Sequence, residues 1–283
     1  MTKTGLVLEG GAMRGIFTAG ILDEFLARDI RFDGIVGVSA GAVFGCSFKS
    51  HQMGRSLRYN LRYCRDWRHC SFRSLLLTGD LYGADFCYRR LPMELDPFDS
   101  AAFAADPAPF WVVTTDVQTG QPLYHLCSDC GEEDLRWMRA SASMPLVSRI
   151  VEADGHRMLD GGISDSIPLR FMKEQGFEKN LVILTQPRDF IKEPSSHMGL
   201  IRRALRRYPK VIDAMERRHA EYNETLDYIR EQEKAGSVMV LAPKEKLPLH
   251  RTEKDPDRIR AVHELGQACA RENEAAVRAF LGL

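Results

Sequence analysis

The sequence predicts an α/β fold in which helices cover the faces of a mainly parallel central sheet. Two observations carry this prediction. Between residues 6 and 48, short apolar runs typical of buried strands alternate with segments whose apolar residues recur at helical spacing. A glycine-rich turn follows the first run, and a G-x-S-x-G pattern follows the second. Such alternation favours parallel strands with helices packed against them.

The remaining elements follow from the same patterns. The opening segment predicts strands at 6–8 and 32–38 and helices at 16–26 and 42–48. Further strands are expected at 110–115, 121–126, 180–185 and 237–241, and a hairpin at 149–159 that turns at Asp154-Gly155. Helices are expected at 51–70, 134–141, 169–174 and 202–234, the last interrupted near Pro209, and a final helix begins at Asp255-Pro256. Residues 71–98 are expected to be irregular.

Length and charge limit the classes of protein. The 283 residues suit one domain spanning 1–283, with a motif-bearing core at about 5–187 and a C-terminal extension at about 188–283. Basic and acidic residues are equal at 39 each, so no global basic field favours nucleic acid as a partner. The sequence shows neither a membrane-spanning apolar run nor a signal peptide, and we expect a cytoplasmic protein.

The seven cysteines are odd in number and scattered. Cys127 and Cys130 have the paired spacing of half a zinc site, and Cys64, His69 and Cys70 are candidates for the other half. The scatter favours reduced thiols without a metal.

Ser39 lies at the end of the second predicted strand, between Gly37 and Gly41. This pattern is typical of a nucleophile elbow, a sharp strand-to-helix turn that exposes the serine hydroxyl. A serine nucleophile needs a positioned base and hydrogen-bond donors for the oxyanion.

Two segments are candidates to supply these groups. The loop 10–15 contains Gly10, Gly11, Ala12 and Arg14, and its backbone N–H groups suit a phosphate or an oxyanion. It lacks the spacing of a nucleotide-binding fingerprint. Asp160 precedes Gly161 and Gly162 directly after a predicted strand, which fits either a plain turn or a residue facing a cleft.

The ordered set of motifs resembles the patatin-like phospholipase family. It comprises Glu9-Gly-Gly-Ala-Met-Arg-Gly15, Gly37-Val-Ser-Ala-Gly41, Ser141-Ala-Ser-Met-Pro145 and Asp160-Gly-Gly162. The resemblance covers about residues 5–187 and implies a three-layer α/β/α fold. It further implies Ser39 as nucleophile, Asp160 as its base, and Gly10, Gly11, Ala12 and Arg14 as the oxyanion hole, without a cofactor or metal. Glu9 and Ala12 depart mildly from the family, which often has aspartate and glycine there.

The expected function is hydrolysis of carboxylic esters of phospholipids or related lipids through a Ser39–Asp160 dyad and an acyl-enzyme. General carboxylesterase, lysophospholipase or acyltransferase activity remains an alternative, as does a non-hydrolytic lipid-binding regulator on the same fold. A Ser-His-Asp hydrolase is disfavoured because Ser39 comes on the second strand rather than after several strands.

Two further segments leave alternatives open. The basic run 202–210 is a solvated helix face or a contact with an anionic membrane surface, and the acidic residues that follow favour solvation. Leu75-Leu76-Leu77 and Phe86 fit an acyl channel, a lid or core packing. A lipid or ester substrate is the expected partner, and the oligomeric state is left open.

Overall fold

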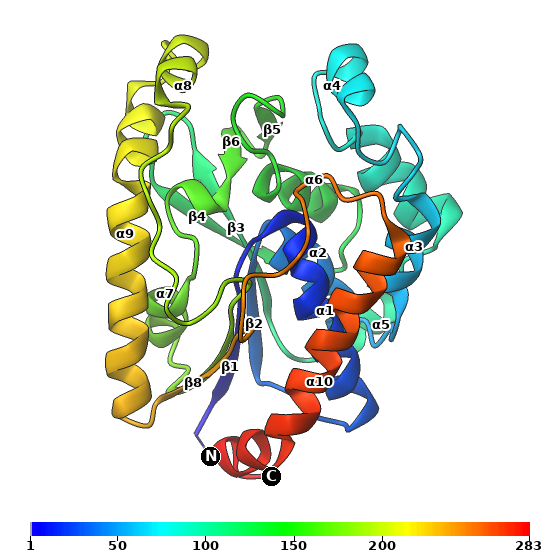
Figure 1. Cartoon of the computed structure of the whole chain (residues 1–283), viewed down its shortest axis with the longest axis vertical. Coiled ribbons are helices and arrows are strands. Elements are labelled where there is room, and N and C mark those ends of the chain that lie inside the picture. Colours follow the sequence, from blue (N-terminus) through cyan, green and yellow to red (C-terminus); the bar gives the residue numbers. More distant parts are fainter. Residues whose placement is uncertain (1) are drawn as a thin grey trace.

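The computed structural model describes residues 2–283. Its strands form one eight-stranded sheet, which helices surround (Figure 1). The strands are β1 (Thr4–Leu8), β2 (Gly34–Val38), β3 (Phe110–Asp116), β4 (Pro122–Cys127), β5 (Val151–Ala153), β6 (His156–Asp160), β7 (Lys179–Ile183) and β8 (Val238–Leu241). The strand order is β5-β6-β3-β2-β1-β7-β8, and β4 pairs with β3.

The sheet is mainly parallel, as the sequence predicts. Strands β3, β2, β1, β7 and β8 pair in parallel, and the antiparallel pairs are β3–β4, β3–β6 and β5–β6. Strand β1, with every residue buried, lies between β2 and β7. The apolar composition of these strands follows from burial on both faces.

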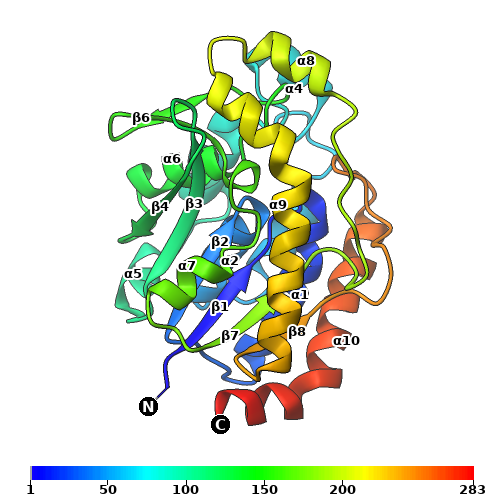
Figure 2. The same ribbon diagram turned by 90° about the vertical axis from the view of Figure 1, so that its left-hand side faces the viewer.

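Helices form a layer on each face of the sheet (Figure 2). They are α1 (Gly15–Ala27), α2 (Ala40–Lys49), α3 (Arg55–Tyr63), α4 (Phe72–Thr78), α5 (Ser100–Ala105), α6 (Glu132–Ser141), α7 (Leu169–Glu174), α8 (Met198–Ala204), α9 (Pro209–Lys234) and α10 (Pro256–Leu281). Alternate side chains of one strand enter opposite layers. Leu6 and Leu8 pack in the core shared with α1, α2 and α10, whereas Val7 packs in the core shared with α7 and α9. The three-layer α/β/α prediction is therefore confirmed.

The predicted elements are confirmed at most positions, but the segment between α2 and β3 differs. The predicted helix 51–70 forms only over Arg55–Tyr63. The segment 71–98, expected to be irregular, contains α4 and the π-helix η2 (Phe86–Leu95), which has Pro92 inside it. Ser71 caps α4 by accepting a hydrogen bond from the Ser74 N–H, and burial of Leu91 stabilises η2.

The C-terminal helix α10 packs closely against α1. It begins after Asp255, whose side chain caps the helix, as predicted. A Cβ atom at Gly266 would lie 2.0 Å from the Phe17 carbonyl oxygen, and one at Gly20 would lie 2.1 Å from the His263 carbonyl oxygen. Glycine at both positions therefore lets the two helix backbones touch.

Among residues 2–283, no helix combines the length and apolar character that crossing a membrane requires.

We expect Gly266→Ala to destabilise the protein by about 1–3 kcal/mol, because the added methyl group forces α10 away from α1. The measurement is the free energy of unfolding in urea. Gly199→Ala on α8 is the matched control, since a Cβ atom there meets no heavy atom within 4 Å. Equal stabilities of the two variants would contradict the close helix contact.

Candidate active site

Strand β3 brings Ser39 and Asp160 together. It pairs with β2 as far as Val38, opposite Val113, and with β6 from Asp160, opposite Thr114. Strand β4 pairs with the other edge of β3. Strand β6 therefore lies on the same edge of β3 as β2, directly beyond the end of β2. Ser39 follows Val38 directly and therefore lies beside Asp160.

Ser39 occupies a strained turn between β2 and α2. Its φ of 53° and ψ of −121° are rarely adopted by a residue with a side chain. The turn is also crowded, because a Cβ atom at Gly37 would lie 2.6 Å from the Ala42 nitrogen and one at Gly41 would lie 2.4 Å from the Leu8 carbonyl oxygen. Both glycines of the G-x-S-x-G pattern are thus required by close backbone packing, as expected of an elbow.

The segment after α6 braces both residues. The Ser39 N–H donates to the Ser141 hydroxyl at 2.7 Å. The Asp160 N–H donates to the Ser143 carbonyl at 2.9 Å. The sequence identifies 141–145 as a motif but does not predict these contacts, because hydrogen bonds between residues far apart in the chain have no local sequence pattern.

Asp160 is buried, with 3% of its surface exposed. Burial raises its pKa to about 6, despite the nearby Arg218 guanidinium, which acts in the opposite direction. Its Oδ1 accepts a hydrogen bond of 2.7 Å from the Gly162 N–H, and the Ser39 hydroxyl also stabilises the carboxylate. A Cβ atom at Gly161 would lie 2.2 Å from the Val113 carbonyl oxygen, so this turn also requires glycine.

The glycine-rich loop lies against the elbow. A Cβ atom at Gly10 would lie 3.0 Å from the Ser39 Cβ. Within residues 2–283, no hydrogen bond satisfies the backbone N–H of Gly10 or Gly11. Ala12 has a φ of 49°, a conformation that favours glycine. The Arg14 N–H donates to the Gly11 carbonyl, so only the guanidinium of Arg14 is free to meet a ligand.

Glu9 anchors this loop to the helical layer that contains α9. One carboxylate oxygen accepts from the Thr185 N–H at 2.6 Å, and the other accepts from the Tyr222 hydroxyl at 2.7 Å. Glu9 thus joins the end of β1 to the segment after β7 and to α9.

The dyad residues open into a cavity of about 200 Å³. One wall is mainly apolar and contains Val43, Phe44, Tyr59, Leu81, Tyr88, Leu91, Met144 and Val147. Arg14, Lys192, Arg218, Tyr222 and Arg251 also line the cavity. Neither the run Leu75-Leu76-Leu77 nor Phe86 lines this cavity, and Phe86 is instead part of the core.

Sequence reasoning missed Lys192, Arg218, Tyr222 and Arg251. Each belongs to a region outside the recognised motifs, and the chain returns to the cavity there only through tertiary packing. Arg218 lies in a charged segment shortly after the basic run 202–210, and nothing in the charge pattern indicates that it faces the cavity.

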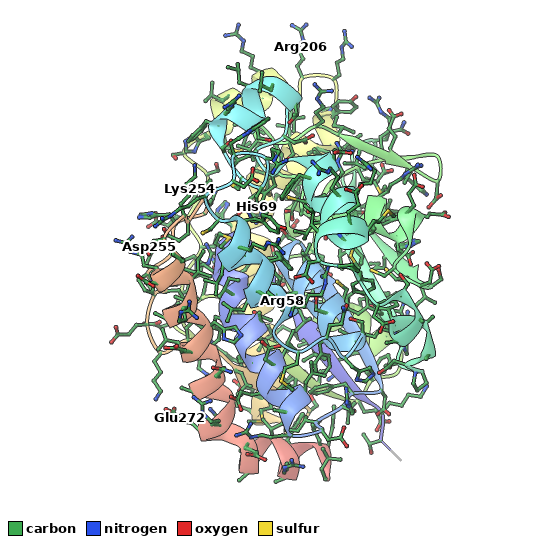
Figure 3. The ribbon with its side chains drawn as sticks, turned by 90° about the vertical axis from the view of Figure 1, so that its right-hand side faces the viewer. Arg58, His69, Arg206, Lys254, Asp255 and Glu272 are labelled. Carbon is green, nitrogen blue, oxygen red and sulfur yellow. The ribbon has the colours of Figure 1, made fainter. Side chains whose placement is uncertain are left out.

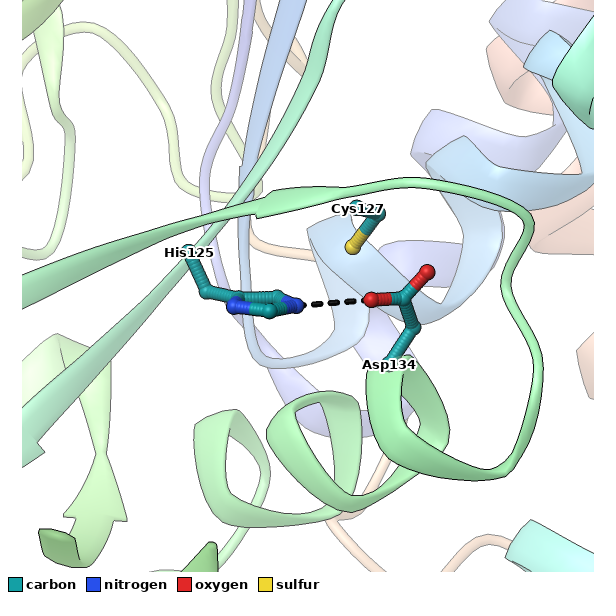
Figure 4. Close-up of side chains that lie close together, drawn as sticks. All are labelled: His125, Cys127 and Asp134. Carbon is teal, nitrogen blue, oxygen red and sulfur yellow. Dashed lines mark hydrogen bonds and ion pairs between the residues drawn. The ribbon is translucent and has the colours of Figure 1, made fainter. Parts of the chain in front are cut away.

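Among residues 2–283, one group of three side chains has the donor types and spacing for a metal, namely His125, Cys127 and Asp134 (Figure 4). These donors are engaged within the chain. His125 Nε2 lies 2.7 Å from Asp134 Oδ1, and Asp134 Oδ2 accepts from the Ser128 N–H at 2.8 Å. Burial raises the pKa of the Cys127 thiol well above its usual range. Cys64, His69 and Cys70 do not belong to this group.

The fold and the site together define an α/β protein with a serine elbow beside a buried aspartate. The family profile described as "Patatin-like phospholipase" matches residues 6–173, and a profile described as "Domain of unknown function (DUF6363)" matches residues 208–282. The chain therefore belongs to the patatin-like phospholipase family.

Several known proteins are similar to parts of this chain. YjjU of Escherichia coli (strain K12), described as uncharacterized, is 32% identical over 202 residues, covering 68% of this chain and 54% of YjjU. Lysophospholipase NTE1 of Scheffersomyces stipitis is 27% identical over 183 residues, covering 61% of this chain and 11% of that protein. The chain thus spans about half the length of YjjU. The crystal structure of VipD from Legionella pneumophila aligns with a TM-score of 0.47 and 10% identity, covering 96% of this chain and 66% of VipD.

We expect the Asp160 carboxyl group to titrate near pH 6, because burial disfavours its charged form. Carbon-13 NMR of aspartate-labelled protein measures this, with Asp160→Asn identifying the signal. In Arg218→Gln the pKa should rise further, since a neighbouring positive charge is lost. A titration at or below the usual value of about 3.9 would contradict the buried site.

Proposed function

We propose that the chain is a serine lipid acyl hydrolase that cleaves carboxylic esters of phospholipids or related lipids through Ser39 and Asp160. The observation that carries this proposal is the juxtaposition of the strained Ser39 elbow and the buried Asp160 in one cavity. Membership of the patatin-like phospholipase family supports it.

In the first half of the reaction, Asp160 accepts the hydroxyl proton of Ser39 while the Ser39 Oγ attacks the ester carbonyl carbon. The carbonyl electron pair moves onto oxygen, and we assign the free N–H groups of Gly10 and Gly11 as its hydrogen-bond donors. We include Ala12 in this oxyanion hole, but not Arg14, whose N–H is already bonded to the Gly11 carbonyl. Collapse breaks the bond to the alcohol oxygen, which takes the proton from Asp160 and leaves.

In the second half, water gives a proton to Asp160 and attacks the acyl carbon on Ser39. Collapse of the second tetrahedral intermediate returns this proton to the Ser39 Oγ and releases the carboxylic acid. A carboxylate with a pKa of about 6 suits this role better than a fully solvated one, because it is a stronger base yet ionised at neutral pH.

The apolar wall between α2 and η2 favours a lipid substrate over a small polar ester. Its aliphatic and aromatic side chains give an acyl chain a place that excludes water. Acyl transfer to an alcohol other than water would use the same two residues.

We also propose peripheral contact with a lipid surface. Helices α4 and α8 lie at the same end of the molecule, opposite both termini (Figures 1 and 2). On α4, Phe72, Leu76 and Leu77 are 76%, 86% and 61% exposed. Arg206, in the loop after α8, projects from the same end (Figure 3). Exposed apolar groups beside arginines suit an anionic bilayer surface.

For the dyad, we expect Ser39→Ala and Asp160→Asn each to lower kcat on a chromogenic short-chain ester by at least a thousandfold, because the first removes the nucleophile and the second removes the proton acceptor. Circular dichroism should show folded proteins. Ser195→Ala and Asp129→Asn, at surface sites, are the matched controls. A fluorophosphonate probe should label Ser39, and comparable turnover in either dyad variant would refute the assignment.

For the lipid surface, the double change Leu76→Asp and Leu77→Asp should weaken binding to phosphatidylglycerol-containing vesicles by tenfold or more, since two apolar side chains no longer insert. Co-sedimentation measures the bound fraction. Leu265→Asp on α10, where the leucine is 49% exposed, is the control. Equal binding of both variants would exclude α4 as the contact.

A further inference from the structure

Four positively charged side chains gather on one wall of the Ser39 cavity. These are Arg14, Lys192, Arg218 and Arg251. They come from the loop after β1, the segment after β7, helix α9 and the loop before α10. Within residues 2–283, none of the four lies within 4.0 Å of a carboxylate oxygen. Side chains so far apart in the sequence meet here only because the fold brings them together.

The chain holds these groups in place through neutral contacts. The Lys192 backbone is fixed by Asn223, which accepts from its N–H at 2.8 Å and donates to its carbonyl at 3.0 Å. The Lys192 ammonium lies 3.9 Å from the centre of the Tyr222 ring. The Arg251 carbonyl accepts from the Tyr82 hydroxyl at 2.7 Å. These contacts orient the cations without neutralising them.

Arg218 and Arg251 both act electrostatically on the Asp160 carboxylate. Arg218 Nε donates to the Gly162 carbonyl, two residues from Asp160. Arg14 Nε is buried and has no hydrogen-bond partner in the described chain. A buried guanidinium nitrogen without a partner is costly, and an incoming oxygen anion would satisfy it.

The carboxylates at the cavity do not balance this charge. Glu9 and Asp160 are the two acidic residues that line it, and four cations face them. Both oxygens of Glu9 are bonded to Thr185 and Tyr222, and Asp160 is bonded to the Gly162 N–H. Burial and then the nearby Arg218 lower the pKa of Lys192 to about 8, and the Glu9 carboxylate offsets this lowering only in part. The neighbouring His69 has its pKa lowered to about 4 by burial and stays neutral.

We propose that Arg14, Lys192, Arg218 and Arg251 form a cationic subsite that binds the phosphate group of an acyl glycerol phosphate while its ester lies at Ser39. Arginine recognises phosphate through paired charge-assisted hydrogen bonds, and lysine contributes a point charge. The acyl chain lies along the apolar part of the cavity lining. This inference rests on the proposed hydrolase function and adds the feature that selects the substrate.

Three of the four cationic residues come from the part of the chain that follows the dyad motifs. Lys192, Arg218 and Arg251 lie outside residues 6–173, which match the family profile. The C-terminal region therefore supplies three of the four cations, and the N-terminal region supplies Arg14 and the dyad.

The experiment compares two substrates with the same ester, a monoacylglycerol and the corresponding monoacylglycerol phosphate. We expect the wild-type protein to hydrolyse the phosphorylated lipid with a kcat/KM at least tenfold higher. Arg251→Gln and Lys192→Gln should each lower the ratio of the two kcat/KM values by about tenfold, mainly through KM. Arg251→Lys should restore part of the ratio, and Arg260→Gln, at an exposed site on α10, should leave it unchanged.

The possible outcomes separate the subsite from its alternatives. If the cations serve only to stabilise the Asp160 carboxylate, both lipids lose activity equally in Arg251→Gln and the ratio stays constant, which would overturn the subsite. Inhibition by inorganic phosphate with equal turnover of the two lipids would overturn the headgroup assignment in favour of a free anion.

A binding measurement separates this inference from the hydrolase proposal. Calorimetry with Ser39→Ala protein and each lipid below its micelle concentration requires no turnover. Tenfold tighter binding of the phosphorylated lipid, lost in the Ser39→Ala, Arg251→Gln double variant, supports the subsite even if no ester is cleaved. Equal binding of the two lipids would refute the subsite while leaving the dyad proposal intact.

Discussion

The site depends on the register of one strand. Strand β3 pairs with the end of β2 and then, one residue further, with the end of β6. This pairing fixes the positions of the elbow serine and of the aspartate. Ser39 comes directly after the last residue of β2, and Asp160 is the last residue of β6. A slip of β6 by one residue would turn the Asp160 side chain to the opposite face of the sheet.

The surrounding contacts protect this register. The glycines at 37, 41 and 161 allow backbone approaches that any side chain would block. Ser141 and Ser143 tie the two turns to the end of α6. Because the elbow is strained, these contacts must hold the Ser39 backbone in a conformation that it would leave if free.

Much of this arrangement was predictable from sequence. The strands around β1 are continuous apolar runs, and the glycines of the elbow and of the 10–15 loop mark turns by their composition, so the order of elements and the candidate dyad followed. The π-helix η2 was not predictable, because Pro92 and Gly83 suggest an irregular chain, whereas burial of Phe86, Leu91 and Pro92 by distant parts of the chain favours the helix. The cationic residues were not predictable either. A lone arginine in a charged helix such as α9 looks the same whether it faces solvent or a cavity.

The close contact of α1 with α10 has a consequence for how the chain is made. Helix α1 leaves the ribosome well before α10, with buried residues on most of its surface, yet α10, which covers part of it, begins only at Pro256. Strand β1 likewise waits for β7 to pair along its second edge. The nascent segment thus exposes apolar surface and an unpaired strand edge until β7 and α10 have been synthesised. Such an intermediate is a natural client for chaperones, and slow translation of the region before α10 would lengthen its exposure.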